Sequence, residues 1–155
     1  MKFDYTKKIQ SVDALKGLLS GKVVFTNGCF DILHVGHITY LQQARSLGDV
    51  LVVALNSDDS VKRLKGEERP VNGLIDRMSL IAALEAVTWV TWFEQDDPVS
   101  VIRALKPNVL VKGGDHAAEG ILGGKDVRSW GGEVLSLSFV GGKSTTSLID
   151  KVRKK

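Results

Sequence analysis

Residues 50–55 form an apolar run without a single polar interruption. A strand of this composition has two apolar faces, and both must be covered, as in a strand buried within a parallel sheet. Four further apolar runs of strand length occur at residues 23–26, 88–93, 108–111 and 133–139, and helix-like segments separate them. This alternation predicts an α/β fold built on a parallel sheet.

Right-handed crossovers between such strands give a doubly wound, Rossmann-like parallel sheet of about five strands in a single domain. Helix start signals agree with this order. Ser11 precedes a helix expected over 12–19, Asn72 one over 74–87, Asp97-Pro98 one over 99–105, and Ser144 one over 148–152.

The rest of the chain divides into a further helix, a loop and an extension. The spacing of apolar residues over 38–47 predicts a helix with one buried face. Residues 62–70 form the longest polar stretch, which predicts a mobile surface loop. We expect residues 1–20 to be an N-terminal helical extension of one domain that spans 1–155.

The composition excludes several classes of protein. With 155 residues, of which 43% are hydrophobic, the chain can bury a core without disulfides or structural metals. Its one cysteine excludes an internal disulfide and favours a reducing compartment. A net charge of +3, from 21 basic and 18 acidic residues, is too small to indicate nucleic acid as a partner. The sequence shows neither a signal peptide nor a membrane-spanning apolar stretch, so we expect a cytoplasmic protein that binds phosphorylated small molecules and no membrane.

Two histidines, His34 and His37, stand three residues apart after the first predicted strand, with Gly36 between them. In a doubly wound sheet, ligands bind at the carboxyl ends of the strands, which is where this loop lies. A helix that begins near Gly36 would direct its free N–H groups and the positive end of its dipole into the loop. With the two imidazoles, this helix start would form a binding site for a triphosphate. The alternative is a pair of polar histidines in the core.

Two other segments carry candidate ligand contacts. Ser144, Thr145 and Thr146 can cap the last helix, and the same hydroxyl and N–H groups can bind phosphate. Residues 112–115 follow the fourth predicted strand. There, glycines allow the backbone to approach a ligand, and Asp115 can accept hydrogen bonds from a base or ribose.

Other kinds of site lack support in the sequence. A P-loop that ends at Gly142, Lys143 and Ser144 would need glycine at position 137, which is leucine, and no G-x-G-x-x-G occurs. The three histidines show no H-E-x-x-H spacing and no cysteine cluster, so we expect no metal held by the protein. We interpret Cys29 as a small buried thiol at a strand end. Asp31 would repel phosphates, so we expect it to fix its loop by accepting backbone N–H bonds.

Residues 27–37 resemble the T-x-G-x-F-D-x-x-H-x-G-H signature of the cytidylyltransferase-like nucleotidyltransferases, and residues 144–146 resemble the second S-T-T motif of that family. The resemblance covers about residues 20–155. It implies that a phosphate oxygen of a second substrate attacks the α-phosphorus of a nucleoside triphosphate in line. His34 and His37 would then be catalytic residues.

The same resemblance implies a cation that closes over the triphosphate from the polar loop. We expect Lys65 in this role, with Lys62 and Arg69 as alternatives. The nucleotide-binding residues that it implies are Asn27, Gly28, Cys29, Phe30, Gly36, Lys112, Gly113, Asp115, Gly142, Ser144, Thr145 and Thr146.

Within the family, residues 69–72, 84–90 and 111–115 look like the heptose 1-phosphate adenylyltransferase branch. Glycerol 3-phosphate cytidylyltransferases carry one arginine near the position of Glu85 and another near that of Phe139, and both are missing here. The heptose enzyme is often the C-terminal half of a two-domain protein with a sugar kinase, and this chain looks like the stand-alone form.

The implied reaction converts ATP and D-glycero-D-manno-heptose 1-phosphate into ADP-heptose and pyrophosphate, a step towards lipopolysaccharide core or another surface glycan. Mg²⁺ would be carried mainly by the nucleotide. A cytidylyltransferase for a polyol phosphate and a nucleotide-binding module without turnover are the alternatives. The stereochemistry of the sugar, the choice of ATP over CTP and the oligomeric state stay open, with a homodimer as one expectation.

Overall fold

Five parallel strands form one sheet in the order β3-β2-β1-β4-β5 in the computed structural model, which describes residues 2–114, 117–138 and 141–154. The strands are β1 Val23–Gly28, β2 Val50–Asn56, β3 Trp89–Phe93, β4 Val109–Gly113 and β5 Glu133–Leu137. All five expected strands are present, although residue 139 of the last prediction lies outside the described residues. The chain runs outward from β1 to β3 and then returns to β4, so the order reverses between β1 and β4.

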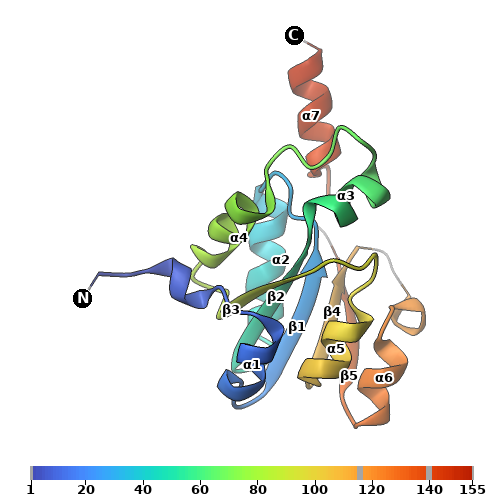
Figure 1. Cartoon of the computed structure of the whole chain (residues 1–155). Coiled ribbons are helices and arrows are strands. Elements are labelled where there is room, and N and C mark those ends of the chain that lie inside the picture. The colour runs from blue at the N-terminus through green and yellow to red at the C-terminus, as the bar shows by residue number, and fades with distance from the viewer. Residues whose placement is uncertain (1, 115–116, 139–140, 155) are drawn as a thin grey trace.

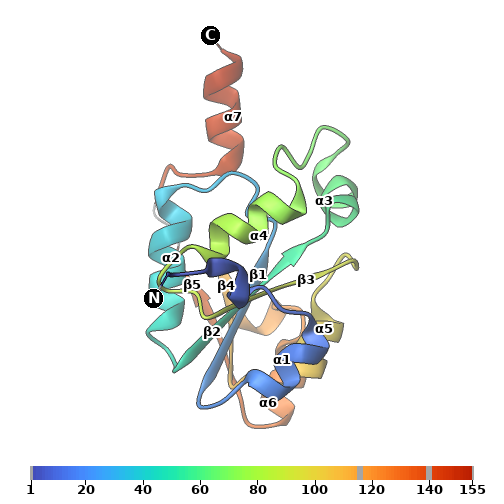
Figure 2. The ribbon, with the colours of Figure 1, turned by 60° about the vertical axis from the view of Figure 1, so that its left-hand side comes forward.

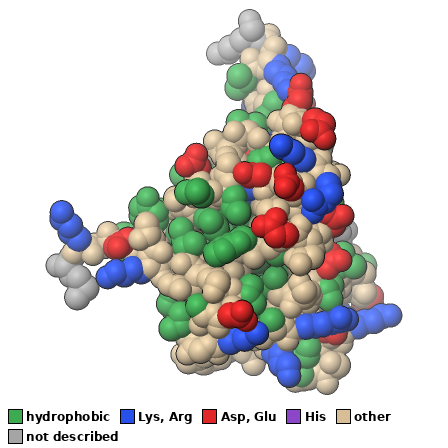
Figure 3. Space-filling model, in the orientation of Figure 1, with side chains coloured by type: hydrophobic (Ala, Val, Ile, Leu, Met, Phe, Trp, Pro, Cys, Tyr) green, Lys and Arg blue, Asp and Glu red, His purple; other side chains and the backbone are tan. Residues whose placement is uncertain are grey.

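Helices cover both faces of this sheet (Figures 1 and 2). One face carries α2 Val35–Arg45 and α4 Leu74–Ala82, and the other carries α1 Val12–Leu18, α5 Val99–Leu105 and α6 Gly124–Ser129. The predicted doubly wound, Rossmann-like sheet is therefore confirmed. Figure 3 shows hydrophobic side chains on the outward side of the α2–α4 layer. Ile38 of α2 and Ile75 of α4 are exposed.

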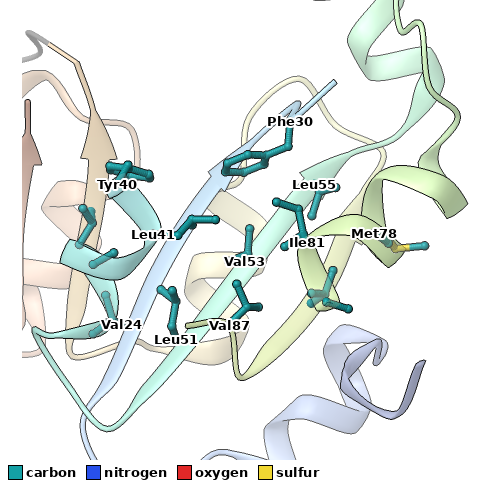
Figure 4. Close-up of a cluster of buried hydrophobic side chains, with 14 of the residues drawn as sticks. Val24, Phe30, Tyr40, Leu41, Leu51, Val53, Leu55, Met78, Ile81 and Val87 are labelled. Carbon is teal, nitrogen blue, oxygen red and sulfur yellow. The ribbon is translucent and has the colours of Figure 1, made fainter. Parts of the chain in front are cut away.

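The apolar run of β2 supplies both cores. Leu51, Val53 and Leu55 pack with α2 and α4 in the first core (Figure 4), whereas Val52 and Ala54 face the second. Successive side chains of a strand point to opposite faces of the sheet, so a strand covered on both sides favours apolar residues at consecutive positions.

Two helices, α3 Asp58–Lys65 and α7 Thr145–Arg153, lie beyond these layers at the carboxyl ends of the strands (Figures 1 and 2). Helix α7 extends away from the sheet and contains no buried residue. Short 3₁₀ helices, η1 Tyr5–Lys8 and η2 Ala118–Gly120, complete the described elements. Across the described ranges, no helix is long and apolar enough to cross a membrane.

The prediction of a loop over residues 62–70 is wrong for its first four residues, which form the second half of α3. The Ser57 side chain caps this helix by accepting a hydrogen bond from the Ser60 N–H. Asp58 and Asp59 occupy the first turn, where carboxylates favour the helix dipole, and Val61 is buried. The cap, the helix dipole and the buried residues Ser60 and Val61 therefore outweigh the polar composition.

Helix α4 also differs from its prediction, since it ends at Ala82 instead of continuing to residue 87. The Lys8 ammonium donates hydrogen bonds to the carbonyls of Leu84 and Val87, which it holds in the turns after the helix. The helix is capped by Gly73 instead of the expected Asn72, whose side-chain amide is used elsewhere.

The remaining helix boundaries agree more closely with the sequence. Helix α2 begins at Val35, three residues before the predicted span and next to the glycine of the histidine motif. Helix α6 was not expected from the sequence. Near the N-terminus, Leu15 of α1 is fully buried in the second core, so residues 12–18 pack against the sheet layers.

Candidate active site

A pocket of about 630 Å³ opens at the carboxyl ends of β1 and β4, where the strand order reverses. This is the position at which doubly wound sheets bind ligands. Twelve of the residues predicted from the sequence line it: Asn27, Gly28, Cys29, Phe30, His34, His37, Lys65, Lys112, Gly113, Ser144, Thr145 and Thr146. The structure thus brings together the three segments that the sequence analysis singled out.

Three predicted residues do not belong to this lining. Gly36 lies beneath the His34 ring, and Gly142 is exposed in a turn with φ of 75°. Asp115 lies outside the described residues. Of the alternative loop cations, Lys62 does not line the pocket, whereas Arg69 does.

The two histidines stack on each other at the start of α2. Their ring centroids are 3.8 Å apart with an interplanar angle of 24°. His34 is the N-cap residue of the helix in an extended conformation, and His37 lies in the first turn. The Phe30 ring supports the other side of His37 at 5.2 Å between centroids. Both imidazoles therefore stand beside the free N–H groups of a helix N-terminus.

Gly36 is required by the position of the His34 ring. A Cβ atom at residue 36 would lie 2.9 Å from His34 Nδ1 and 3.4 Å from Lys143 Cβ. The first contact is closer than packed atoms allow, so a side chain here would displace the ring from the helix start. The glycine of the motif thus leaves the space in which the His34 ring lies.

Burial, together with the neighbouring His34, lowers the pKa of His37 to about 4. The pKa of His34 is also lowered, first by burial and then by the positive charge of Lys143. His37 is consequently neutral at pH 7. The buried Nδ1 atoms of both rings have no hydrogen-bond partner among the described residues. A neutral imidazole still offers one N–H to a phosphate oxygen.

Asp31 fixes the segment that follows α3. Its buried carboxylate accepts hydrogen bonds from Arg69 Nε at 2.6 Å and from the backbone N–H groups of Val71 and Asn72 at 2.9 Å. Burial alone would raise the pKa of Asp31, but the hydrogen bonds from Asn72, Val71 and Arg69 hold it below its ordinary value. The predicted structural role is confirmed. Arg69 is occupied by this carboxylate and is a poor candidate for the phosphate cation.

Arg77, which the sequence analysis did not consider, links several segments next to the pocket through hydrogen bonds. Its side chain is fully buried and donates to the carbonyls of Cys29, Asn56 and Asn72, and to the carboxylate of Asp58. These partners belong to the ends of β1 and β2, the segment before α4, and the start of α3. One guanidinium therefore sets the relative positions of the pocket walls.

The charges of the pocket leave an excess of cations. The two carboxylates in its described lining, Asp31 and Asp96, are paired with Arg69 and Arg63. Lys65, Lys112 and Lys143 also line the pocket, and none of them forms an ion pair with a described residue. Such a site suits a ligand with several negative charges.

The N-terminus of α7 closes one side of the pocket. Ser144 caps the helix by accepting from the Ser147 N–H in a capping box, and Thr145 Oγ1 donates to the Ile32 carbonyl at 3.0 Å. The expected capping role of Ser144 is confirmed. The N-termini of α2 and α7 both meet this pocket, so two helix dipoles favour an anion there.

The sequence analysis missed several lining residues, namely Tyr40, Asn56, Leu64, Asp96, Pro98, Gly120, Ile121, Leu122 and Lys143. Lys143 stands next to the predicted Ser144 motif, and Asn56 is the first polar residue after the apolar run of β2, so both had a signal. Burial raises the pKa of the Cys29 thiol, which does not suit a nucleophile. Within the described part of the chain, no group of three or more His, Cys, Asp or Glu could hold a metal ion.

Comparison with known sequences identifies a family profile and individual proteins that are similar to this chain. The profile of the cytidylyltransferase-like family matches residues 25–142. "Bifunctional protein HldE" of Hahella chejuensis is 57% identical over 133 residues, which is 86% of this chain and 28% of the relative. The protein of the same name from Geobacter metallireducens is 51% identical over 155 residues, which is 96% of this chain and 32% of the relative. The chain thus spans about a third of the length of these curated relatives.

Solved structures are similar to this fold as well. A lipopolysaccharide core biosynthesis protein from Thermoplasma volcanium superposes with a TM-score of 0.64 at 30% identity, over 78% of this chain and 98% of that one. Pantothenate synthetase from Thermus thermophilus has a TM-score of 0.61 at 15% identity, over 86% and 62% of the two chains, and shows the shared fold alone. From its profile match, its relatives and its structure, the chain belongs to the cytidylyltransferase-like family of nucleotidyltransferases.

Proposed function

We propose that this protein transfers AMP from ATP to D-glycero-D-manno-heptose 1-phosphate, giving ADP-heptose and pyrophosphate. The observation that carries the proposal is a single pocket that combines the stacked His34–His37 pair at a helix N-terminus with three lysines that lack an ion pair to a described residue. The names of the relatives and of the lipopolysaccharide core biosynthesis protein support the sugar branch.

In the proposed reaction, a phosphate oxygen of the sugar 1-phosphate forms a new bond to the α-phosphorus of ATP. The bond from this phosphorus to the oxygen that bridges to the β-phosphate breaks, and pyrophosphate leaves with the electron pair. No protein nucleophile is needed, in keeping with the raised pKa of Cys29. Mg²⁺ would be held mainly by the nucleotide phosphates.

In this reaction, different residues of the pocket would have different roles. His34, His37 and the N-terminus of α7 at Ser144–Thr146 would bind the phosphates and neutralise the charge that develops on the leaving group. Each preorganised donor of this kind is worth about 3 kcal/mol in the transition state. Gly28 and Gly113 would allow the nucleotide to approach the strand ends.

A panel of nucleotides and sugar phosphates tests the proposal. We expect pyrophosphate release with ATP, Mg²⁺ and D-glycero-D-manno-heptose 1-phosphate, and a much lower kcat/KM with CTP and glycerol 3-phosphate. The difference can exceed about 10⁴-fold, because the wrong partner leaves polar groups of the site unpaired. Preference for CTP at matched Mg²⁺ would reject the adenylyltransferase branch and keep nucleotidyl transfer. Nucleotide binding without pyrophosphate release from any pair would indicate a module without turnover.

A second prediction concerns Lys65, the last residue of α3, whose side chain reaches the pocket. If it binds the distal phosphates, Lys65→Ala should weaken ATP binding and turnover by about ten- to hundredfold while AMP binding changes little. Calorimetric titration with both nucleotides measures this. Lys62→Ala is the matched control, since Lys62 lies on the same helix, is exposed and does not line the pocket. Equal losses for AMP and ATP would show that Lys65 does not contact the distal phosphates.

A further inference from the structure

The pocket extends over both faces of the sheet at its carboxyl edge. At one end, His34 and His37 stand at the start of α2, and the Phe30 ring beside them belongs to the first core. At the other end, residues 120–122 line the pocket just before α6, and Ile121 belongs to the second core. Helices α2 and α6 lie on opposite faces of the sheet (Figure 1). A ligand that fills this pocket therefore crosses the strand ends.

The segment at the second end is held in place by packing against α5. A Cβ atom at Gly123, which has a φ of 82°, would lie 2.6 Å from Ile102 Cδ1 of α5. Ile121 is 8% exposed, and its carbonyl accepts a hydrogen bond from the Gly124 N–H at 2.9 Å. The position of this segment on the second face of the sheet therefore does not depend on a bound ligand.

The two ends of the pocket differ in their chemistry. The first end holds the two imidazoles, Lys143 and the hydroxyl groups at the start of α7. The second end is lined by residues whose side chains carry no polar group, namely Pro98 at the start of α5, Gly120, Ile121 and Leu122. Asp96, two positions before Pro98, also lines the pocket and is paired with Arg63. A phosphate or a sugar hydroxyl would find no side-chain partner among the four apolar residues.

Leu122 is the most exposed of the large apolar side chains in the described pocket lining, at 63%. A Cβ atom at Gly120 would meet nothing within 4 Å, so the space beside this residue is open. An apolar side chain on the wall of a pocket favours a ligand that covers it with apolar surface. Of the parts of the two proposed substrates, the nucleobase alone has a flat apolar face without hydroxyl groups or charge.

We propose that residues 120–122 bind the nucleobase of the nucleoside triphosphate, with the face of the base against Leu122. The triphosphate then crosses the strand ends to the N-termini of α2 and α7. This assignment rests on the proposed function. It gives the second end of the pocket a ligand that the phosphate-binding residues at the first end do not account for.

Calorimetric titration with ATP and with inorganic tripolyphosphate tests the assignment, because tripolyphosphate carries the phosphates without the base. Leu122→Ser should weaken ATP binding about tenfold and leave tripolyphosphate binding within about twofold of the wild type. Leu122→Met should bind ATP nearly as well as the wild type, because it restores an apolar side chain of similar size. Leu80→Ser is the control for loss of an exposed leucine, since Leu80 lies on α4, is 45% exposed and is outside the described lining.

These titrations separate the base site from the proposed function. If the wild type binds ATP but turns over no substrate pair, the proposed function fails, while the titrations still decide whether Leu122 contacts the base. Unchanged ATP binding by Leu122→Ser would overturn the base site, and so would an equal loss for ATP and tripolyphosphate or an equal loss in Leu80→Ser. Circular dichroism checks the fold of each variant, and Leu122→Ala serves if the serine variant is unfolded.

Discussion

Replacing His34 or His37 by alanine should lower kcat at least about a hundredfold while the protein stays folded. Both rings stand at the N-terminus of α2, stacked at 3.8 Å between centroids. A donor lost from this position leaves the charge on the leaving phosphates without compensation. The expected loss corresponds to about 3 kcal/mol of transition-state stabilisation for each ring.

Pyrophosphate release at saturating ATP and acceptor measures this loss, with circular dichroism as the check on folding. Val35→Ala is a suitable control, because Val35 lies between His34 and Gly36 and is 52% exposed. Activity within a few-fold of the wild type in both histidine variants would remove the central claim. A normal rate in one of them would assign that histidine to structure.

Replacing Arg77 by methionine should lower the free energy of unfolding by about 3–5 kcal/mol, because the fully buried guanidinium is the donor to three backbone carbonyls. The guanidinium is 0% exposed and makes four hydrogen bonds of 2.8–2.9 Å. Methionine fills similar space but leaves three carbonyls without this donor and Asp58 without its partner. Each of the three carbonyls that loses its donor costs about 1–3 kcal/mol, which accounts for the total, whereas the Asp58 side chain is 46% exposed and can be solvated.

Urea denaturation followed by circular dichroism measures the change. Arg103→Met is the matched control, since the Arg103 side chain is 64% exposed and pairs with Asp126 on the protein surface. This control should leave the urea midpoint nearly unchanged, because exposed ion pairs contribute little. A midpoint for Arg77→Met close to that of the wild type would mean that the four hydrogen bonds do not hold the ends of β1 and β2.

The strands and the grouping of the candidate site residues in one pocket were predictable from the sequence for physical reasons. A parallel strand is buried on both faces, so its apolar run is visible without any partner, as in residues 50–55. The glycine of the histidine motif and the Ser144 cap are local features as well. Gly36 leaves room for the His34 ring, which lies two residues before it in the chain. The Ser144 side chain accepts a hydrogen bond from the Ser147 N–H, three residues after it.

The features that were missed depend on contacts between distant segments. Helix α4 ends early because Lys8 takes the carbonyls of Leu84 and Val87, more than 70 positions away. The Asp31 carboxylate takes Arg69 from 38 positions away. Composition treats each lysine or arginine as a solvated charge, so it also cannot reveal a buried one such as Arg77.

Helix α7 carries part of the proposed phosphate site and yet buries none of its residues. Its attachments include the hydrogen bond from Thr145 to the Ile32 carbonyl and the pair Arg153–Glu68, whose side chains are 63% and 79% exposed. Segments held in this way open at a lower free energy than the core, so backbone amides of α7 should exchange with solvent faster than those of β1. A triphosphate that contacts Ser144–Thr146 would slow this exchange by mass action. Salt would speed it by screening the exposed pair, so that ionic strength acts on nucleotide affinity through the docking of this helix as well as through the phosphates.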